Sequence, residues 1–279
     1  TGKAMPLLAY FNPCMIIRIL KANRNLLWQL LKRNIASRYK GSVLGLFWSF
    51  AQPLMMLAVY SFVFGIVFKA RWGDATAGTS DVPFPLIMFC GMAVFNIFAE
   101  SVNAGAVVIS GNATYAKKVV FPLEILPVMT VLTSMVFGLA WFAMLFIGSI
   151  VFLHEIYWTL IFLPLVFLPL FLLSAGLAFF VSSLGVYLRD IQQIIGIVTQ
   201  ILFFMTPIFY STAIVPTKLR WVMEINPLSY LVEECRKYIL FNQTPDWIVV
   251  VVSFLVSFVV FQLGAVWFME TKKGFADVL

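Results

Sequence analysis

The sequence predicts an all-α integral membrane protein. It is expected to have six transmembrane helices, an N-terminal amphipathic helix at the membrane interface and two short outer helices that re-enter the bilayer. Of the 279 residues, 62% are hydrophobic and only 11% are charged, and the mean hydropathy is +0.98. A soluble domain carries about 25% charged residues, so this chain has too little charge to cover a water-facing surface. Its uncharged runs are also long enough to cross a bilayer, which takes about 20 apolar residues.

The N-terminal region, residues 1–41, is strongly basic. It has no Asp or Glu before Gly41, and its eight cations are Lys3, Arg18, Lys21, Arg24, Lys32, Arg33, Arg38 and Lys40. Positive charge beside a membrane segment favours the cytoplasmic side and attracts anionic lipid. The region lacks a signal-peptide pattern, because Pro13 and Arg18 interrupt its apolar run, so we expect it to be retained.

Residues 24–40 have the pattern of an amphipathic helix. On a helical projection, Leu27, Leu30 and Leu31 lie on one side, whereas Lys32 and Lys40 lie on the other. Asn34 and Arg38 interrupt the apolar side, and a side chain as long as Arg38 can reach a lipid phosphate. The pattern predicts a helix that lies in the interface, either as a simple anchor or as a cytoplasmic cuff that docks a partner.

Six apolar runs are predicted to span the membrane: 43–68, 82–109, 125–153, 156–188, 191–217 and 247–269. Only Glu100 interrupts the second run. An even number of spans places both termini on one side. With the N-terminus inside, 13 Lys and Arg residues lie on the cytoplasmic side and six lie outside, so the positive-inside rule predicts that both termini are cytoplasmic.

The connections between these runs differ in length. Residues 154–155 and 189–190 are short links that force antiparallel neighbours. Residues 110–124 form a longer cytoplasmic segment. Residues 213–246, the outer segment, carry too many charges to span, and their helical periodicity over 228–241 predicts a pair of short helices that dip back into the outer leaflet.

The sequence lacks the motifs of common catalytic and nucleotide sites. It has no GxxxxGK[ST] P-loop, no HExxH and no GxSxG. Its one histidine, His154, lies in a tight outer turn, and Cys14, Cys90 and Cys235 have neither disulfide nor metal spacing. We expect a protein that moves or anchors something, with no cofactor on this chain and no nucleic-acid partner.

Two minor alternatives stay open at this point. Glu100 is a carboxylate in a span without a deep cationic partner, so it offers only weak support for an ion-driven carrier. The outer segment carries the carboxylates of Glu224, Glu233, Glu234 and Asp246, which leaves a membrane-embedded transferase possible by counting alone.

Four segments carry a resemblance. They are LLKRNIASRYKGSVLGLFWSFAQPL near the N-terminus, KKVVFPLEILPV (117–128), YLRDI (187–191) and NPLSYLVEECRKYIL (226–240). Together, and in this order, they resemble the membrane subunit of ATP-binding-cassette exporters for O-antigen, capsular polysaccharide and teichoic acid. The resemblance extends over nearly the whole chain, and it is far less specific for the sugar that is exported.

The resemblance implies a bacterial inner-membrane exporter. This chain would form a homodimer above two copies of a cytoplasmic P-loop ATPase, which would bind the ATP and magnesium. The expected cargo is a lipid-linked polysaccharide, first of all O-antigen. The alternatives are teichoic acid, capsule and small amphiphilic drugs.

The resemblance also implies roles for particular residues. The segment 110–124 would hold a helix that couples to the ATPase, and the two outer helices would form a gate on the exit side. The ATPase-coupling residues would be Tyr115, Lys117, Lys118, Phe121, Pro122, Glu124, Arg189 and Asp190. The basic helix would admit the pyrophosphate of a lipid carrier through Lys32, Arg33, Arg38, Tyr39 and Lys40. The first and fifth spans would line the path, with the aromatic residues Trp48, Tyr60, Phe203, Phe204 and Tyr210.

Overall fold

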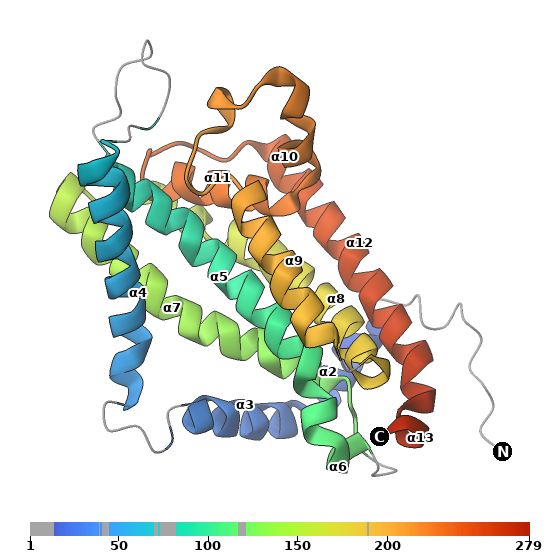
Figure 1. The fold of residues 1–279 in the computed structure, drawn as a ribbon. Helices are drawn as coiled ribbons and strands as arrows, with labels where there is room; N and C mark the ends of the chain where they lie inside the picture. The colour runs from blue at the N-terminus through green and yellow to red at the C-terminus, as the bar shows by residue number, and fades with distance from the viewer. Residues whose placement is uncertain are drawn as a thin grey trace.

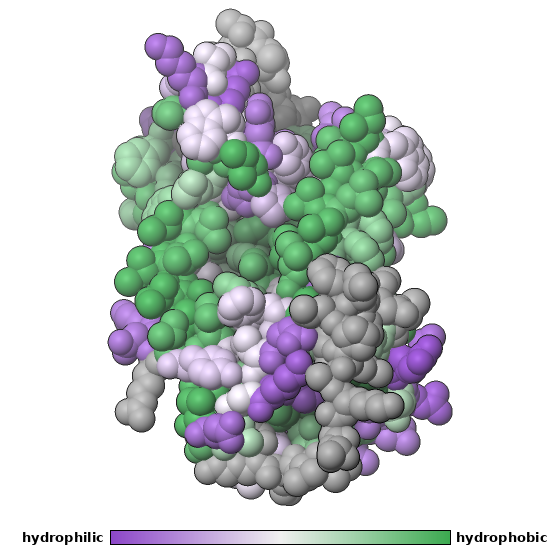
Figure 2. Space-filling model, turned by 90° about the vertical axis from the view of Figure 1, so that its right-hand side faces the viewer, coloured by the Kyte–Doolittle hydropathy of each residue, from purple (hydrophilic) through white to green (hydrophobic). Residues whose placement is uncertain are grey.

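The structure is a computed structural model, and it describes residues 14–38, 40, 45–69, 72, 82–116, 121–188 and 190–279. The regular elements in these ranges are all helices (Figure 1). Figure 2 shows a broad apolar band between two hydrophilic ends. An apolar band of this kind is what a lipid bilayer requires, so the prediction of an all-α membrane protein is confirmed.

Five helical segments are long and apolar enough to cross a membrane. The first runs from Trp48 to Val67 and consists of α4 (Trp48–Tyr60) followed by a π-helical stretch (Ser61–Val67). The others are built on α5 (Phe84–Val108), α7 (Ile125–Leu153), α8 (Pro164–Tyr187) and α12 (Trp247–Thr271). These segments agree with five of the six predicted runs.

The remaining predicted run, 191–217, is not one continuous helix. Helix α9 covers only Ile191–Met205, and Thr206 is extended, with φ −87° and ψ 137°. The cause is Pro207, because a proline ring disfavours helical geometry in the residue before it. The predicted C-terminal bound is therefore wrong. At 1.5 Å per residue, α9 is about 22 Å long, shorter than a hydrocarbon core of about 30 Å.

Helix α5 lies at the centre of the bundle and packs against α7, α8, α9 and α11 (Figure 1). Glycines let α8 approach its neighbours closely. A Cβ added to Gly264 of α12 would lie 2.0 Å from the Gly176 carbonyl oxygen of α8, and one added to Gly185 of α8 would lie 1.9 Å from the Ala106 carbonyl oxygen of α5. Small residues at crossings are the usual way in which membrane helices gain contact area.

Helices α2 (Cys14–Ala22) and α3 (Arg24–Arg38) lie at one end of the bundle, together with α6 (Ala113–Ala116) and the C-terminal α13 (Phe275–Val278). Figure 1 shows α3 running across the ends of the long helices instead of alongside them. Its Leu30 and Leu31 are buried, and the helix packs against α7. This arrangement agrees with the predicted interfacial helix.

The opposite end holds two short helices, α10 (Trp221–Ile225) and α11 (Pro227–Ile239) (Figure 1). The residue between them, Asn226, caps α11, since its side chain accepts a hydrogen bond from the Leu228 backbone N–H at 3.0 Å. Pro227 then occupies the first helical position, where its missing N–H has no cost. The segment therefore forms two short helices as predicted, while their re-entry into the outer leaflet stays a prediction.

Candidate functional site

A polar cavity of about 350 Å³ lies between α4, α5, α7 and α9 and opens on the side where Gln52 and Gln200 are exposed. Its lining consists of amides, a hydroxyl, aromatic rings and small apolar groups. The lining residues are Gln52, Met56, Tyr60, Met92, Phe95, Asn96, Ala99, Asn103, Trp141, Thr199, Gln200 and Phe203. We call it the transmembrane cavity. Its size falls at the lower end of small-molecule sites, about 300–1,000 Å³.

Helical spacing brings three lining residues of α5 onto one face of the helix. Asn96, Ala99 and Asn103 are three or four residues apart, so they share one face, which is turned toward α9. The Asn103 amide donates to the Thr199 hydroxyl at 3.2 Å and to the Ala99 carbonyl at 2.7 Å. Thr199 in turn donates to the Ile195 carbonyl at 2.9 Å. This chain of hydrogen bonds fixes one wall of the cavity.

Three further amides in the cavity have no protein partner among the described residues. They are Gln52 on α4, Asn96 on α5 and Gln200 on α9. An amide that is kept from both water and a partner costs several kcal/mol in an apolar medium. Gln52 and Gln200 are exposed and Asn96 is half-buried, so the three amides can bond to water or to a polar ligand.

Aromatic rings make up the rest of the wall. Phe95 and Phe203 lie 5.1 Å apart between ring centroids, and Tyr60 packs edge-on against Phe209 at 5.7 Å. Among the described residues that line the cavity, none is charged. The cavity thus offers ring faces and neutral hydrogen-bonding groups, the combination that suits a neutral ligand with both C–H faces and hydroxyl groups.

A second pocket, of about 260 Å³, lies where α3 meets α5 and α7. Arg38 of α3 forms an ion pair with Glu100 of α5, and these side chains are 36% and 33% exposed. The Asn34 amide donates to the Thr133 hydroxyl of α7 at 3.1 Å. A partly exposed ion pair contributes roughly 0.2–1 kcal/mol, so the pair orients α3 more than it stabilises the fold. The cationic partner of Glu100 thus comes from the interfacial helix, because α3 crosses beneath the bundle and brings the exposed Arg38 to it.

The structure divides the aromatic residues that were expected to line a path. Tyr60 and Phe203 line the transmembrane cavity. Phe204 and Tyr210 instead line an apolar pocket nearer the outer segment, where the Tyr210 hydroxyl donates to the Phe204 carbonyl at 2.8 Å. Trp48 lies at the start of α4 and is 40% exposed.

Most of the expected ATPase-coupling residues lie at the α3 end. The Tyr115 ring stacks on Phe121 with centroids 4.5 Å apart, and Arg33 of α3 donates to the Tyr115 hydroxyl at 3.0 Å. Pro122 leads into α7, since its carbonyl accepts from the Ile125 backbone N–H. The segment around α6 is thus in contact with the interfacial helix.

Glu124 is placed differently from its neighbours. Its side chain is buried and ion-paired with Lys272 at the end of α12. Asp190 lies directly before α9. Three residues expected to couple to the ATPase, Lys117, Lys118 and Arg189, fall outside the described residues.

Among the residues expected at the membrane entrance, Lys32 is exposed, with its ammonium 5.0 Å from the centre of the Trp28 ring. Lys40 is also exposed, and Tyr39 falls outside the described residues. With Arg33 and Arg38, these cations keep the α3 end positive.

Sequence reasoning missed most of the polar residues of the cavity: Gln52, Asn96, Asn103, Thr199 and Gln200. The available signal was an amide inside an otherwise apolar run, because such a group is costly in lipid. Charge patterning alone does not reveal these neutral groups.

Comparison with known proteins identifies the chain. The family model described as "ABC-2 type transporter" matches residues 25–240. This match includes α3, the transmembrane cavity and the outer helices α10 and α11.

The chain belongs to the ABC-2 type transporter family.

Similar proteins match along nearly the whole length of this permease. One from Klebsiella pneumoniae, named O-antigen export system permease protein RfbA, is 25% identical over 268 residues, which are 93% of this chain and 98% of the relative. Another of the same name, from Myxococcus xanthus, is 28% identical over 265 residues, which are 94% of this chain and 98% of the relative. The protein is therefore a multi-pass membrane permease, and the segments built on α4, α5, α7, α8 and α12 are long and apolar enough to span the membrane.

Proposed function

We propose that this permease is the transmembrane subunit of an ATP-driven exporter. Its cargo would be a lipid-linked polysaccharide, O-antigen in particular, which it moves from the cytoplasm across the bacterial inner membrane. The transmembrane cavity carries this proposal, because its neutral amides and aromatic rings suit sugar hydroxyls and the C–H faces of sugar rings. The printed names of the relatives from Klebsiella pneumoniae and Myxococcus xanthus support the same cargo.

The working unit would contain two copies of this chain and two copies of a cytoplasmic P-loop ATPase. Membership of the ABC-2 family and a sequence without a P-loop both support a separate subunit that binds ATP and magnesium. The exposed faces of α4 and α9 support a second copy, since both helices carry an amide, Gln52 and Gln200, that lipid would not accommodate.

The orientation follows from charge. The α3 end carries the basic residues and would face the cytoplasm together with both termini. Helix α9 would complete the set of six as the fifth span in chain order, continued by the irregular residues after Met205, because non-helical backbone is tolerated in a bilayer where protein buries it.

The α6 region would receive the motion of the ATPase. Tyr115, Lys117, Lys118, Phe121 and Pro122 would form the main contact. Arg189 and Asp190 would form a smaller one. We assign Glu124 a positioning part in this contact, since its ion pair with Lys272 ties the segment to α12.

Export would begin at α3 and end at the outer helices. Lys32, Arg33, Arg38, Tyr39 and Lys40 would bind the phosphates of the lipid carrier. The sugar chain would then pass along α4 and α9, past Trp48, Tyr60, Phe203, Phe204 and Tyr210. Helices α10 and α11 would gate the exit. Teichoic acid, capsule and amphiphilic drugs are the alternative cargoes, and the uncharged cavity disfavours the polyanions among them.

The test is a deletion strain complemented with this gene. We expect surface polysaccharide to be lost on deletion and restored by the intact permease. The purified permease should carry a P-loop ATPase with it. Exchange of residues 110–124 for a flexible linker should leave membrane insertion intact, while it uncouples ATP hydrolysis from export. Normal surface polysaccharide in the deletion strain, together with increased drug sensitivity, would favour a drug exporter instead.

A further inference from the structure

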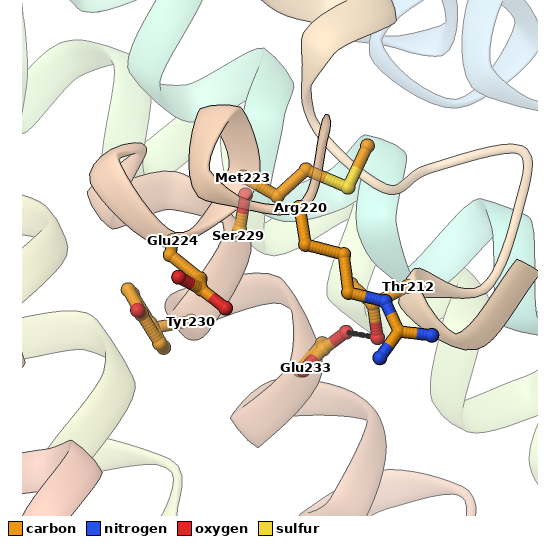
Figure 3. A pocket seen from close by; sticks show the side chains of 7 residues that line it. All are labelled: Thr212, Arg220, Met223, Glu224, Ser229, Tyr230 and Glu233. Carbon is orange, nitrogen blue, oxygen red and sulfur yellow. Dashed lines mark hydrogen bonds between the residues drawn. The ribbon is translucent and has the colours of Figure 1, made fainter. Parts of the chain in front are cut away.

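Another polar pocket, of about 290 Å³, lies beside α10 and α11. Seven side chains from α10, α11 and the turns before them line it, and Figure 3 shows them: Thr212, Arg220, Met223, Glu224, Ser229, Tyr230 and Glu233. We call it the outer pocket. None of these residues lines the transmembrane cavity, so the two are separate sites.

The helix that carries three of these side chains is held firmly. Arg236 of α11 is buried and donates three hydrogen bonds to backbone carbonyls, those of Ile87 on α5 at 3.1 Å, Pro207 at 2.7 Å and Ile208 at 3.0 Å. Its guanidinium also lies 4.3 Å from the centre of the Trp72 ring. These contacts join α11 to the core and to the segment that follows α9, so the outer pocket has a fixed wall.

The junction of α10 and α11 is also fixed. The Asn226 amide donates to the Thr206 hydroxyl at 2.9 Å, while its oxygen caps α11. Glu224 precedes this junction and Ser229 follows it. The outer pocket is therefore built on defined backbone, as a binding site requires.

One buried hydroxyl of the outer pocket is left without a hydrogen-bond partner in the described part of the chain. Ser229 is only 4% exposed, and its hydroxyl has no partner among the described residues. Thr212 donates to one oxygen of Glu233 at 3.0 Å (Figure 3). Burial and the charges of Glu224 and Glu233 raise the pKa of the Tyr230 phenol. The phenol therefore keeps its proton at neutral pH and can donate a hydrogen bond.

The charges of the lining restrict the class of ligand. The carboxylates of Glu224 and Glu233 repel an anion. The Arg220 guanidinium disfavours a metal ion, and the described residues contain no cluster of three or more His, Cys, Asp or Glu that could hold a metal. A neutral polyhydroxyl ligand fits, because its hydroxyls can donate to the carboxylates and accept from the Ser229 and Tyr230 hydroxyls. The Met223 side chain and the Tyr230 ring offer apolar surface to a sugar face.

We propose that the outer pocket binds a neutral sugar unit of the exported polymer on the exit side of the membrane. This inference rests on the proposed function. Helix α9 and the turns that follow it connect the two sites, because Phe203 lines the transmembrane cavity and Thr212 lines the outer pocket. A polymer held at both sites would be hindered from sliding back.

The test uses the complete exporter in membranes from cells that make radiolabelled polysaccharide. A photo-crosslinking amino acid, benzoylphenylalanine, replaces Tyr230 of the outer pocket, Phe203 of the transmembrane cavity or, as control, Ile225. Ile225 is 72% exposed on α10 and lines neither site. We expect labelled glycan to crosslink from positions 230 and 203 but not from 225.

Carboxylate variants test the chemistry of the outer pocket. Glu224→Gln combined with Glu233→Gln should reduce crosslinking from position 230 by about tenfold, as expected for lost charge-assisted hydrogen bonds, while crosslinking from position 203 persists. Glu155→Gln is the matched control, since Glu155 is an exposed carboxylate outside the pocket. If labelled glycan crosslinks from position 203 but not from position 230, the outer pocket is not a sugar site, while the proposed function still holds. The absence of crosslinked glycan at both positions would contradict the proposed function itself.

Calorimetric titration provides a test that does not depend on export. The purified exporter in nanodiscs is titrated with lipid-free oligosaccharide released from the source strain's polysaccharide, and separately with calcium chloride. We expect the double glutamine variant to bind the oligosaccharide about tenfold more weakly than the intact protein does. Calcium binding that depends on Glu224 and Glu233, with oligosaccharide binding unaffected by their loss, would identify the outer pocket as a cation site and overturn the inference.

Discussion

Helices α4 and α5 have similar hydropathy but opposite surroundings. In the most apolar 18-residue stretch of each span, 78% of the residues are buried for α5 but only 6% for α4. Lipid and protein interior are both apolar, so hydropathy does not tell them apart. The features that differ are small residues and irregular geometry. Helix α5 meets its neighbours at glycine-containing crossings, whereas α4 contains Pro53 and continues into a π-helical stretch.

The contrast indicates that α5 belongs to a fixed core, whereas α4 belongs to a face that no part of the described chain covers. Helix α5 contacts α7, α8, α9 and α11 and thus holds the permease together. Helices α4 and α9 present exposed apolar side chains next to amides of the transmembrane cavity. π-helical segments are frequent at functional sites, which agrees with placing the changeable part of the permease on α4.

The largest expected effect comes from filling a crossing on α5. In Gly185→Leu, the new Cβ would lie 1.9 Å from the Ala106 carbonyl oxygen, so α8 and α5 would have to separate. We expect a loss of roughly 3 kcal/mol or more and aggregation in size-exclusion chromatography after detergent extraction.

Gly196→Leu on α9 is the matched control, because nothing lies within 4 Å of the added Cβ. It should leave the unfolding temperature of the single chain within about 2 °C of that of the intact protein. Equal damage from both substitutions would mean that α9 is packed as tightly as α5, and the contrast between core and uncovered face would be lost.

Substitutions in the transmembrane cavity should change stability less than Gly185→Leu does, but they should reduce transport strongly. Gln52→Leu and Gln200→Leu remove amides that have no protein partner among the described residues, so folding should be unchanged or slightly favoured. Export of polysaccharide should fall by about tenfold, because the polymer loses polar contacts in an apolar environment. The measurements are surface polysaccharide and the thermal unfolding of the purified permease.

Gln193→Leu serves as the control for this pair. Gln193 is exposed on the same helix, α9, but does not line the cavity. Normal export in Gln52→Leu and Gln200→Leu, or an equal defect in Gln193→Leu, would remove the transmembrane cavity from the transport path.

Much of this architecture was predictable from the sequence, because span length and charge asymmetry are direct consequences of the bilayer. Five spans, the interfacial helix α3 and the pair α10 and α11 follow from apolar runs and the positions of charges. The end of α9 did not follow from hydropathy, since the run stays apolar through Pro207. Proline geometry was the signal that should have shortened that helix.

The candidate site was harder to predict, because it depends on which helices meet. Helical spacing predicts that Asn96 and Asn103 share a face, but it does not predict that Thr199 lies opposite them. Pairing of Arg38 with Glu100 requires α3 to cross beneath α5, a tertiary fact. The aromatic residues cannot be told apart by residue type. Only the fold shows that Tyr60 and Phe203 line the transmembrane cavity, whereas Phe204 and Tyr210 line another pocket.

The smallest expected effect concerns cysteine reactivity, which compares the core with the cavity directly. Cys235 of α11 is buried, and its thiol lies 3.5 Å from that of Cys90 on α5. Burial raises the pKa of the Cys235 thiol well above its ordinary value, so it stays protonated at pH 8.5, where an exposed cysteine is about half ionised. Since thiolates react and thiols do not, Cys235 should label with maleimide at least about tenfold more slowly than an exposed cysteine.

The comparison uses a Cys14→Ser background with and without Gln52→Cys, which adds a thiol to the transmembrane cavity. We expect Gln52→Cys to label and the background to stay unlabelled at pH 8.5. The raised pKa of Cys235 also makes the stability of the protein depend on pH. The unfolded thiol ionises near pH 8.5, while the folded one holds its proton. The stabilising contribution of Cys235 is therefore complete below that pH and is lost progressively as the pH rises from it toward the higher pKa of the folded thiol. Rapid labelling of the background protein would show that α11 opens away from α5, and the outer end would then belong to the mobile part of the permease instead of its core.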